Sequence, residues 1–213
     1  MARLINGANG PFSGKVGSII GYTMNGVGYM KGPYKLRTKA PTAGELLNRE
    51  KFAAAQSWLS PALNMVRAGF KGYKPSFQGF SAAKSWLMKN ALQVIDGKVV
   101  IDPSLVKISS GSLRLPEDLN CTFEEPDMFR FKWKPTAPSV LEREQVMVLI
   151  YNIEKGVGYG YVYGNNLSHG EQLVKVELFK GGTTLHCYLA VLATDRSNQS
   201  DSVYLGKFEI GYD

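Results

Sequence analysis

The sequence predicts an α+β protein in which an N-terminal β-hairpin and several helices precede a C-terminal β-sandwich. Three observations carry this prediction: an Asn-Gly pair between two β-prone runs, a helix-forming composition after it, and short apolar segments separated by turn residues from about residue 96. Because the texture changes there, we expect a basic hairpin-plus-helices region over residues 1–95 and a β-sandwich domain over residues 96–213.

The hairpin is predicted by Asn25-Gly26. Both central residues of a type I′ turn need a positive φ, and Asn-Gly is the strongest two-residue signal for that turn. Short β-prone runs flank the pair, Ile19 to Met24 before it and Val27 to Met30 after it. We therefore expect two antiparallel strands joined at this pair.

The stretch before the hairpin, GPFSGKVGSIIGY, contains the Gly-Lys pair of a phosphate-binding loop. Such a loop reads G-x-x-x-x-G-K-[ST] between a strand and a helix. Asn9 and Val16 occupy the positions of the first glycine and of the hydroxyl residue, and the β-branched residues that follow disfavour a helix. We expect these glycines to serve turns and close backbone contacts, so the stretch predicts no cofactor.

Three helices are predicted, over residues 43–59, 61–70 and 81–93. Thr42 and Glu45 have the T-x-x-E spacing of a capping box at the start of the first helix. Good helix formers dominate the residues that follow. Ser60-Pro61 indicates a stop and a restart, because proline is favoured at the first position of a helix.

The C-terminal part alternates short strands with turn residues. Phe129, Phe131 and Trp133 alternate with cationic residues, which is the period of two of a half-buried strand. Strands are predicted over residues 99–101, 105–113, 128–134, 146–153, 159–163, 172–178, 184–193 and 203–210. About seven short strands in about 110 residues are typical of a β-sandwich.

Charge is unevenly distributed along the 213 residues, whose net charge is +7. Residues 1–95 contain 13 Lys or Arg and 2 acidic residues, a net charge of +11. Residues 96–213 contain 12 Lys or Arg and 16 acidic residues, a net charge of −4. Such a basic half predicts contact with nucleic acid, another polyanion, an acidic protein or the chain's own acidic half.

Six candidate contact residues combine positive charge with aromatic rings: Tyr29, Lys31, Tyr34, Lys35, Arg37 and Lys39. Cations interleaved with rings can follow a phosphate backbone while bases stack on the rings. The alternative is a hairpin edge on which lysines prevent unwanted strand pairing. No RNP1, zinc-finger or KH motif accompanies the segment. It therefore predicts contact with a polyanion or with a protein partner.

We expect no catalytic residues, no cofactor and no metal. His169 lies in a turn-like segment without a G-x-S-x-G motif, and His186 is expected to face solvent on a strand. The two cysteines, Cys121 and Cys187, lack the spacing of a zinc site and are expected in the core. The segment TDRSNQSDS offers oxygens for Ca²⁺ but lacks the glycine and terminal glutamate of an EF-hand.

The sequence predicts no membrane partner. No apolar run approaches the ~18 residues of a membrane helix, and the start, MARLINGANGPF, shows no apolar core of a secretory signal. A reducing, cytoplasmic compartment is therefore the default expectation for the two cysteines.

Two segments of the C-terminal part resemble the fibronectin type III and immunoglobulin-like fold. FRFKWKPTAPS is similar to its second strand, in which a tryptophan ends an alternating run before a Pro-containing loop. LHCYLAVLATDRSNQSDSVYLG is similar to its last hairpin. The resemblance implies a sandwich of this kind. Cys121, Trp133 and Cys187 also allow the immunoglobulin Cys-Trp-Cys pattern, so the pairing of the cysteines stays open.

Most of the chain also resembles a set of uncharacterised bacterial proteins classified only as a domain of unknown function. The resemblance rests on GPFSGKVGSIIGYTMNGVGYMKGP, with its GKVG motif, and on TAGELLNREKFAAAQSWLSPAL, KISSGSL, QVMVLIYN and SDSVYLG. It implies a hairpin and helices followed by a sandwich, and it brings no catalytic residues.

The favoured function is that of a non-enzymatic structural or protein-interaction protein, with a protein partner or self-assembly as its mode of contact. The alternative is a nucleic-acid-associated protein that uses the basic N-terminal region. A hydrolase with the sandwich as an accessory module would rest on fold analogy alone.

Overall fold

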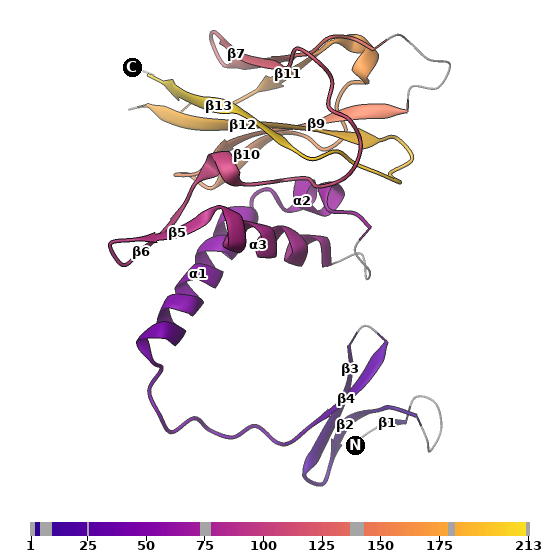
Figure 1. Cartoon of the computed structure of the whole chain (residues 1–213), viewed down its shortest axis with the longest axis vertical. Helices are drawn as coiled ribbons and strands as arrows, with labels where there is room; N and C mark the ends of the chain where they lie inside the picture. The colour runs from indigo at the N-terminus through magenta and orange to yellow at the C-terminus, as the bar shows by residue number, and fades with distance from the viewer. Residues whose placement is uncertain are drawn as a thin grey trace. The chain divides into compact units, whose positions relative to one another are not determined.

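A computed structural model of the protein describes residues 3–4, 10–24, 26–72, 78–136, 143–178 and 182–211. It divides into two compact units, residues 1–45 and residues 46–213. The described residues form a mixed structure, mostly β with three α-helices, and its sheets are antiparallel (Figure 1).

The first unit contains a four-stranded sheet in the order β1-β2-β3-β4. Its strands are β1 (Arg3–Leu4), β2 (Phe12–Val16), β3 (Ile19–Met24) and β4 (Val27–Lys31). The predicted hairpin is present, because Met24 pairs with Val27 and Tyr22 with Tyr29. Gly26 has the positive φ, 79°, that the turn needs, whereas Asn25 lies outside the described residues.

The glycine-rich stretch forms strands and a turn in place of a strand–loop–helix. Lys15 lies within β2, opposite Ile20 of β3. A Cβ on Gly21 would lie 2.4 Å from the Phe12 carbonyl oxygen, so only glycine allows this close approach.

The helices are α1 (Ala43–Leu59), α2 (Leu63–Gly69) and α3 (Gln78–Asn90). The capping box is confirmed: the Thr42 N–H donates to Glu45 Oε2 (2.8 Å), and the Glu45 N–H donates to Thr42 Oγ1 (3.3 Å). α1 ends just before Ser60, as expected, but the prediction that the next helix begins at Pro61 was wrong, because α2 begins at Leu63. The Ser60 hydroxyl donates back to the Gln56 carbonyl (2.7 Å) and does not cap α2.

Two other predicted elements were wrong in part. The third helix ends at Asn90, because Leu92–Ile95 (β5) pairs with Lys98–Ile101 (β6) around Asp96-Gly97, two residues with positive φ. No strand spans residues 105–113. That described segment follows a short 3-10 turn, η1 (Pro103–Leu105), and bonds to other parts of the chain, with the Ser110 N–H donating to the Gly69 carbonyl at 2.9 Å.

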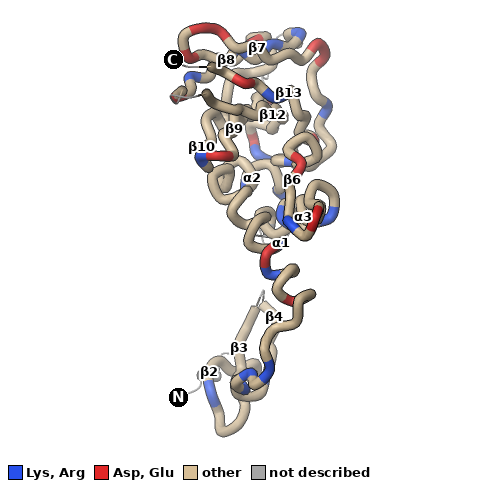
Figure 2. The backbone as a smooth tube through the Cα atoms, turned by 90° about the vertical axis from the view of Figure 1, so that its left-hand side faces the viewer, with Lys and Arg blue, Asp and Glu red and all other residues tan. Residues whose placement is uncertain are grey.

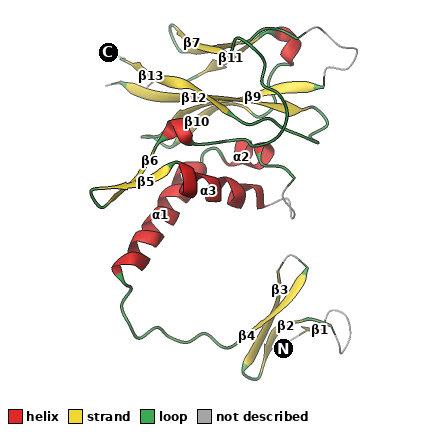
Figure 3. Ribbon diagram, in the orientation of Figure 1, coloured by secondary structure: helices red, strands yellow, loops and turns green. Residues whose placement is uncertain are grey.

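The remaining strands form two sheets, in the orders β10-β9-β12-β13 and β11-β8-β7 (Figure 3). Their bounds are β7 (Asn120–Glu124), β8 (Met128–Lys132), β9 (Glu144–Asn152), β10 (Val157–Tyr161), β11 (Glu171–Lys175), β12 (Thr183–Ala193) and β13 (Val203–Ile210). A second 3-10 turn, η2 (Leu167–His169), precedes β11. Both sheets lie in the second unit.

The four-stranded sheet is buried on both faces. One face packs on the three-stranded sheet through residues such as Val148, Cys187 and Phe131. The other packs on the helices through residues such as Tyr151 and Trp58. The second unit therefore has three layers, helices, central sheet and outer sheet. The helices share a core with β9 and β12, and the expected domain boundary after residue 95 stays a prediction.

His186 does not face solvent, contrary to the expectation from the sequence. It lies on β12, 8% exposed, with Nδ1 2.9 Å from the Tyr204 hydroxyl oxygen. The Tyr204 ring stacks on the imidazole, with centroids 6.0 Å apart. Burial lowers the pKa of His186, the nearby Lys207 lowers it further, and Asp102 opposes the shift.

We expect His186 to make stability fall on acidification. Because its pKa is lower in the folded state, the unfolded chain binds the proton more readily, so stability is present above the unfolded pKa of about 6.5 and declines below it. The slope of unfolding free energy against pH, measured by urea denaturation between about pH 7.5 and about pH 5.5, should be smaller in His186→Gln. His169→Gln, at an exposed position, is the matched control. Equal slopes in wild type and His186→Gln would contradict this assignment.

Candidate interaction site

The six candidate contact residues all lie in the first unit. Tyr29 and Lys31 belong to β4, and the other four belong to the irregular segment between β4 and α1: Tyr34, Lys35, Arg37 and Lys39. All six are exposed.

A stacked ring pair stands at the centre of the hairpin. The Tyr22 and Tyr29 rings lie 5.5 Å apart at 19°, and Lys31 Nζ lies 5.3 Å from the Tyr22 ring centroid. Tyr22 was not among the predicted contact residues. The Asn-Gly signal could have found it, because a two-residue turn at positions 25 and 26 places residue 22 opposite residue 29.

Arg37 fixes the local backbone. Its Nη1 and Nη2 donate to the two carboxylate oxygens of Glu45 (2.9 and 2.6 Å), and its Nε donates to the Lys39 carbonyl (2.7 Å). The hydrogen bond to Glu45 raises the pKa of Arg37. The guanidinium therefore ties the irregular segment to the first turn of α1. In contrast, Lys31 and Lys35 form no ion pair within the described ranges.

Large apolar side chains are exposed throughout this unit. Every residue of β4 is exposed. Because neighbours on a strand point to opposite faces, Tyr29 and Met30 expose an apolar side chain on each face of the sheet. Tyr34 is 83% and Leu36 85% exposed. Residues 1–45 carry six Lys or Arg and one acidic residue (Figure 2). Such exposed apolar faces suit a contact surface.

The sequence offered histidines and a calcium-like segment as candidate ligands, and all of them lie in the second unit. No group of three His, Cys, Asp or Glu residues is placed to hold a metal ion within the described ranges. His169 lies in η2 and is exposed, whereas His186 lies on β12 and is buried. The calcium candidate is not assembled, because Asp195 accepts from Ser197 within its own turn while Asp201 pairs with Lys107 (2.6 Å).

Acidic residues of β7 and β11 form ion pairs within the outer sheet. Glu124 ends β7 and binds Arg130 of β8 through both carboxylate oxygens (2.6 and 2.9 Å). Arg130 also donates to Glu171 of β11, so the three strands of the outer sheet share one ionic contact. The hydrogen bond to Arg130 lowers the pKa of Glu124.

A family comparison covers nearly all of this structure. The model of a family of unknown function, DUF6266, matches residues 11–206. The chain belongs to the DUF6266 family. The resemblance to a domain of unknown function is thus confirmed, and the match reaches from β2 into β13. No curated protein and no solved structure matches this DUF6266 chain.

The two cysteines of this DUF6266 protein lie in the apolar cluster between the sheets. Both are buried and carry free thiols. Burial raises the pKa of the Cys187 thiol, and the adjacent Cys121 thiol raises it further. A thiol held protonated is a poor nucleophile and a poor metal ligand. The described helices include none that is both long and apolar enough to cross a membrane.

Proposed function

We propose that this DUF6266 protein is a non-enzymatic interaction protein whose N-terminal sheet, together with the irregular segment that follows β4, docks on the acidic β-rich part of a second copy of the chain. The observation that carries the proposal is the exposure of large apolar side chains on both faces of that sheet. A soluble protein rarely keeps such a surface uncovered, and it usually marks a contact site.

Apolar burial would supply the free energy of this contact. Met30, Tyr34 and Leu36 are 72%, 83% and 85% exposed. Full burial of one such side chain contributes about 1.5–3 kcal/mol. Burying the three together would supply several kcal/mol, against the cost of association.

Charge complementarity favours a second copy as the partner. The first unit is basic, whereas residues 96–213 have a net charge of −4. A hollow of about 290 Å³ at the ends of β12 and β13 is lined by Glu154, Thr184 and Glu209. The ion pair of Glu209 with Lys207 is exposed and therefore weak, so an incoming lysine could replace Lys207. The two surfaces in contact, the first unit of one copy and the acidic part of the next, are different. The contact is therefore head-to-tail, and further copies can add to the assembly.

We expect the wild-type protein to self-associate in a salt-sensitive way. Its mass, measured by light scattering after size exclusion, should rise between about 1 µM and about 200 µM protein at about 50 mM salt, and should fall as salt screens the charges. Tyr34→Ser with Leu36→Ser should shift the concentration for association upward at least about tenfold, since apolar burial is lost.

Leu46→Ser is the matched control, since Leu46 is a 52% exposed apolar residue of α1 and lies outside the acidic part formed by residues 96–213. It should associate like the wild type. A wild-type protein that stays monomeric over the whole concentration range at low salt would overturn the proposal of self-assembly.

Nucleic acid is the second candidate partner. The stacked Tyr22–Tyr29 pair with Lys31 beside it favours this function, because rings and cations together bind single strands without sequence preference. Binding of single-stranded DNA whose affinity falls steeply with salt, with a smaller slope in Lys31→Gln with Lys35→Gln, would support it.

For the fold, an immunoglobulin or fibronectin type III-like sandwich remains our proposal. Lettered in chain order, β7 to β13 become A, B, C, C′, E, F and G, which gives sheets A-B-E and C′-C-F-G. An immunoglobulin constant domain has A-B-E-D and C-F-G, so the difference is that the fourth strand pairs with C. Trp133, at the end of strand B, is buried and donates to the Leu167 carbonyl (2.8 Å).

A further inference from the structure

A basic pocket lies in the second unit, beside the end of α2. It is a hollow of about 500 Å³ that is wide open to solvent, and its lining includes Arg67, Ala68, Lys71, Val162, Tyr163 and Arg196. This volume is in the range of small-molecule sites. The pocket belongs wholly to residues 46–213 and is independent of the interaction surface of the first unit.

Three cations from two separate parts of the chain line this pocket. Arg67 and Lys71 are four residues apart, at the end of α2 and just beyond it. Arg196 comes from the turn between β12 and β13, and Lys71 Nζ lies 3.4 Å from its carbonyl oxygen. Among the described residues, no carboxylate lines the pocket, and none of the three cations forms an ion pair. Like charges brought together without a counter-charge favour an anion.

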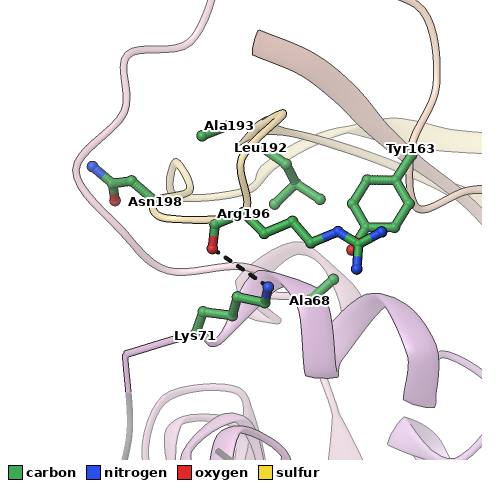
Figure 4. A pocket seen from close by; sticks show the side chains of 7 residues that line it. All are labelled: Ala68, Lys71, Tyr163, Leu192, Ala193, Arg196 and Asn198. Atoms are coloured by element: carbon green, nitrogen blue, oxygen red, sulfur yellow. Dashed lines mark hydrogen bonds between the residues drawn. The ribbon is translucent and has the colours of Figure 1, made fainter. Parts of the chain in front are cut away.

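Arg196 is held in a defined position. Its φ is 61°, a left-handed conformation, and its N–H donates to the Ala193 carbonyl (2.9 Å). The guanidinium lies over the Tyr163 ring, 4.8 Å from the centroid (Figure 4). Stacking occupies the flat face of a guanidinium and leaves the N–H groups at its edge available as donors. An arginine prepared in this way can bind an oxyanion with little loss of side-chain entropy.

We propose that this pocket binds the phosphate group of a small phosphorylated molecule. Two arginines and a lysine exceed what one carboxylate would neutralise, whereas a phosphate monoester carries about −1.5 to −2 charges near neutral pH. Arginine also matches the geometry of phosphate with paired donors. Ala68, Val162 and the Tyr163 ring offer an apolar wall to the organic part of the ligand.

Pyrophosphate titrated into the full chain, with calorimetry and the thermal midpoint as readouts, tests this site. We expect saturable heat and a saturable rise of the midpoint. Arg67→Gln with Arg196→Gln should weaken the affinity at least about tenfold, since each loses charge-assisted donors. The control is Lys89→Gln with Lys98→Gln, which changes two exposed cations elsewhere in the same unit. This control has the same net charge as the pocket variant, and it should bind pyrophosphate like the wild type.

Arg67→Gln alone is the second variant, because Arg67 is exposed and its loss should leave the fold intact. It should also weaken pyrophosphate binding. Equal binding by the pocket variant and the control variant would mean non-specific attraction and would overturn the proposal. So would absent binding, or binding of citrate in preference to pyrophosphate. A DNA oligonucleotide should bind the pocket variant and the wild type equally well. Equal binding would mean that the phosphates of DNA contact the protein outside this pocket, which agrees with the proposal.

Discussion

A chain that begins at residue 96 should fail to unfold cooperatively, whereas a chain that begins at residue 41 should keep the transition of the full protein. The reason lies in the central sheet, whose helix-facing side chains become exposed when the helices are removed. These side chains are Met147, Leu149, Tyr151, Tyr188, Ala190 and Leu192. Five of them are large, and each contributes about 1.5–3 kcal/mol when buried. The total is comparable to the whole stability of a domain, about 5–15 kcal/mol.

Circular dichroism during urea denaturation measures this comparison. The chain from residue 41 is the control, because it keeps the whole of α1 with its capping box at Thr42 and Glu45, the two units are separately compact, and the apolar cluster begins at Ala55. If residues 96–213 alone unfolded cooperatively at the same urea concentration, the helices would be dispensable. The boundary expected after residue 95 would then mark an autonomous domain.

Local signals predicted elements well where partners are near in sequence. The capping box at Thr42 and Glu45 needs only four residues, and the hairpin at Gly26 needs only its two flanking runs. Elements were misplaced where distant groups decide. Residues 105–113 were predicted as a strand, but the Ile108 N–H bonds to Ser202 Oγ (3.0 Å), 94 residues along the chain, without a ladder.

The hydrophobic pattern of the strands contains a signal for the three layers, although we predicted only the two sheets of a sandwich. A strand covered on one face alternates, whereas a strand covered on both faces is continuously apolar. FRFKWK alternates and lies in the outer sheet, whereas QVMVLIYN is nearly continuous and lies in the central one. That contrast indicates a further layer over the second strand. The pattern alone does not predict that the helices form this further layer.

The two candidate sites differ in how far the sequence could predict them. The basic aromatic segment is contiguous, so composition alone found it, although Arg37 is engaged with Glu45. The sequence did not predict the basic pocket, because Arg67 and Arg196 are far apart in sequence. They line one pocket only because α2 packs beside the hairpin of β12 and β13.

Gly69→Ala should be among the most destabilising single substitutions in the second unit. A Cβ at this position would lie 2.3 Å from the Ile108 carbonyl oxygen and 2.8 Å from Ser109 Cα, which are both backbone atoms. α2 would have to move away and break the bond from the Ser110 N–H to the Gly69 carbonyl (2.9 Å). Overpacking costs about 1–3 kcal/mol and a buried unsatisfied group about 1–3 kcal/mol, so we expect a loss of about 2–6 kcal/mol.

Gly44→Ala is the matched control, because no heavy atom lies within 4 Å of the Cβ it would add. Alanine is the better helix former, so this change in α1 should be neutral or stabilising by up to about 1 kcal/mol. Urea denaturation of both variants separates the effect of close packing from that of helix propensity. A loss below about 1 kcal/mol in Gly69→Ala would mean that α2 can shift without cost. In that case α2 could not hold Arg67 and Lys71 in a fixed relation to Arg196, and the preorganisation argued for the phosphate pocket would fail with it.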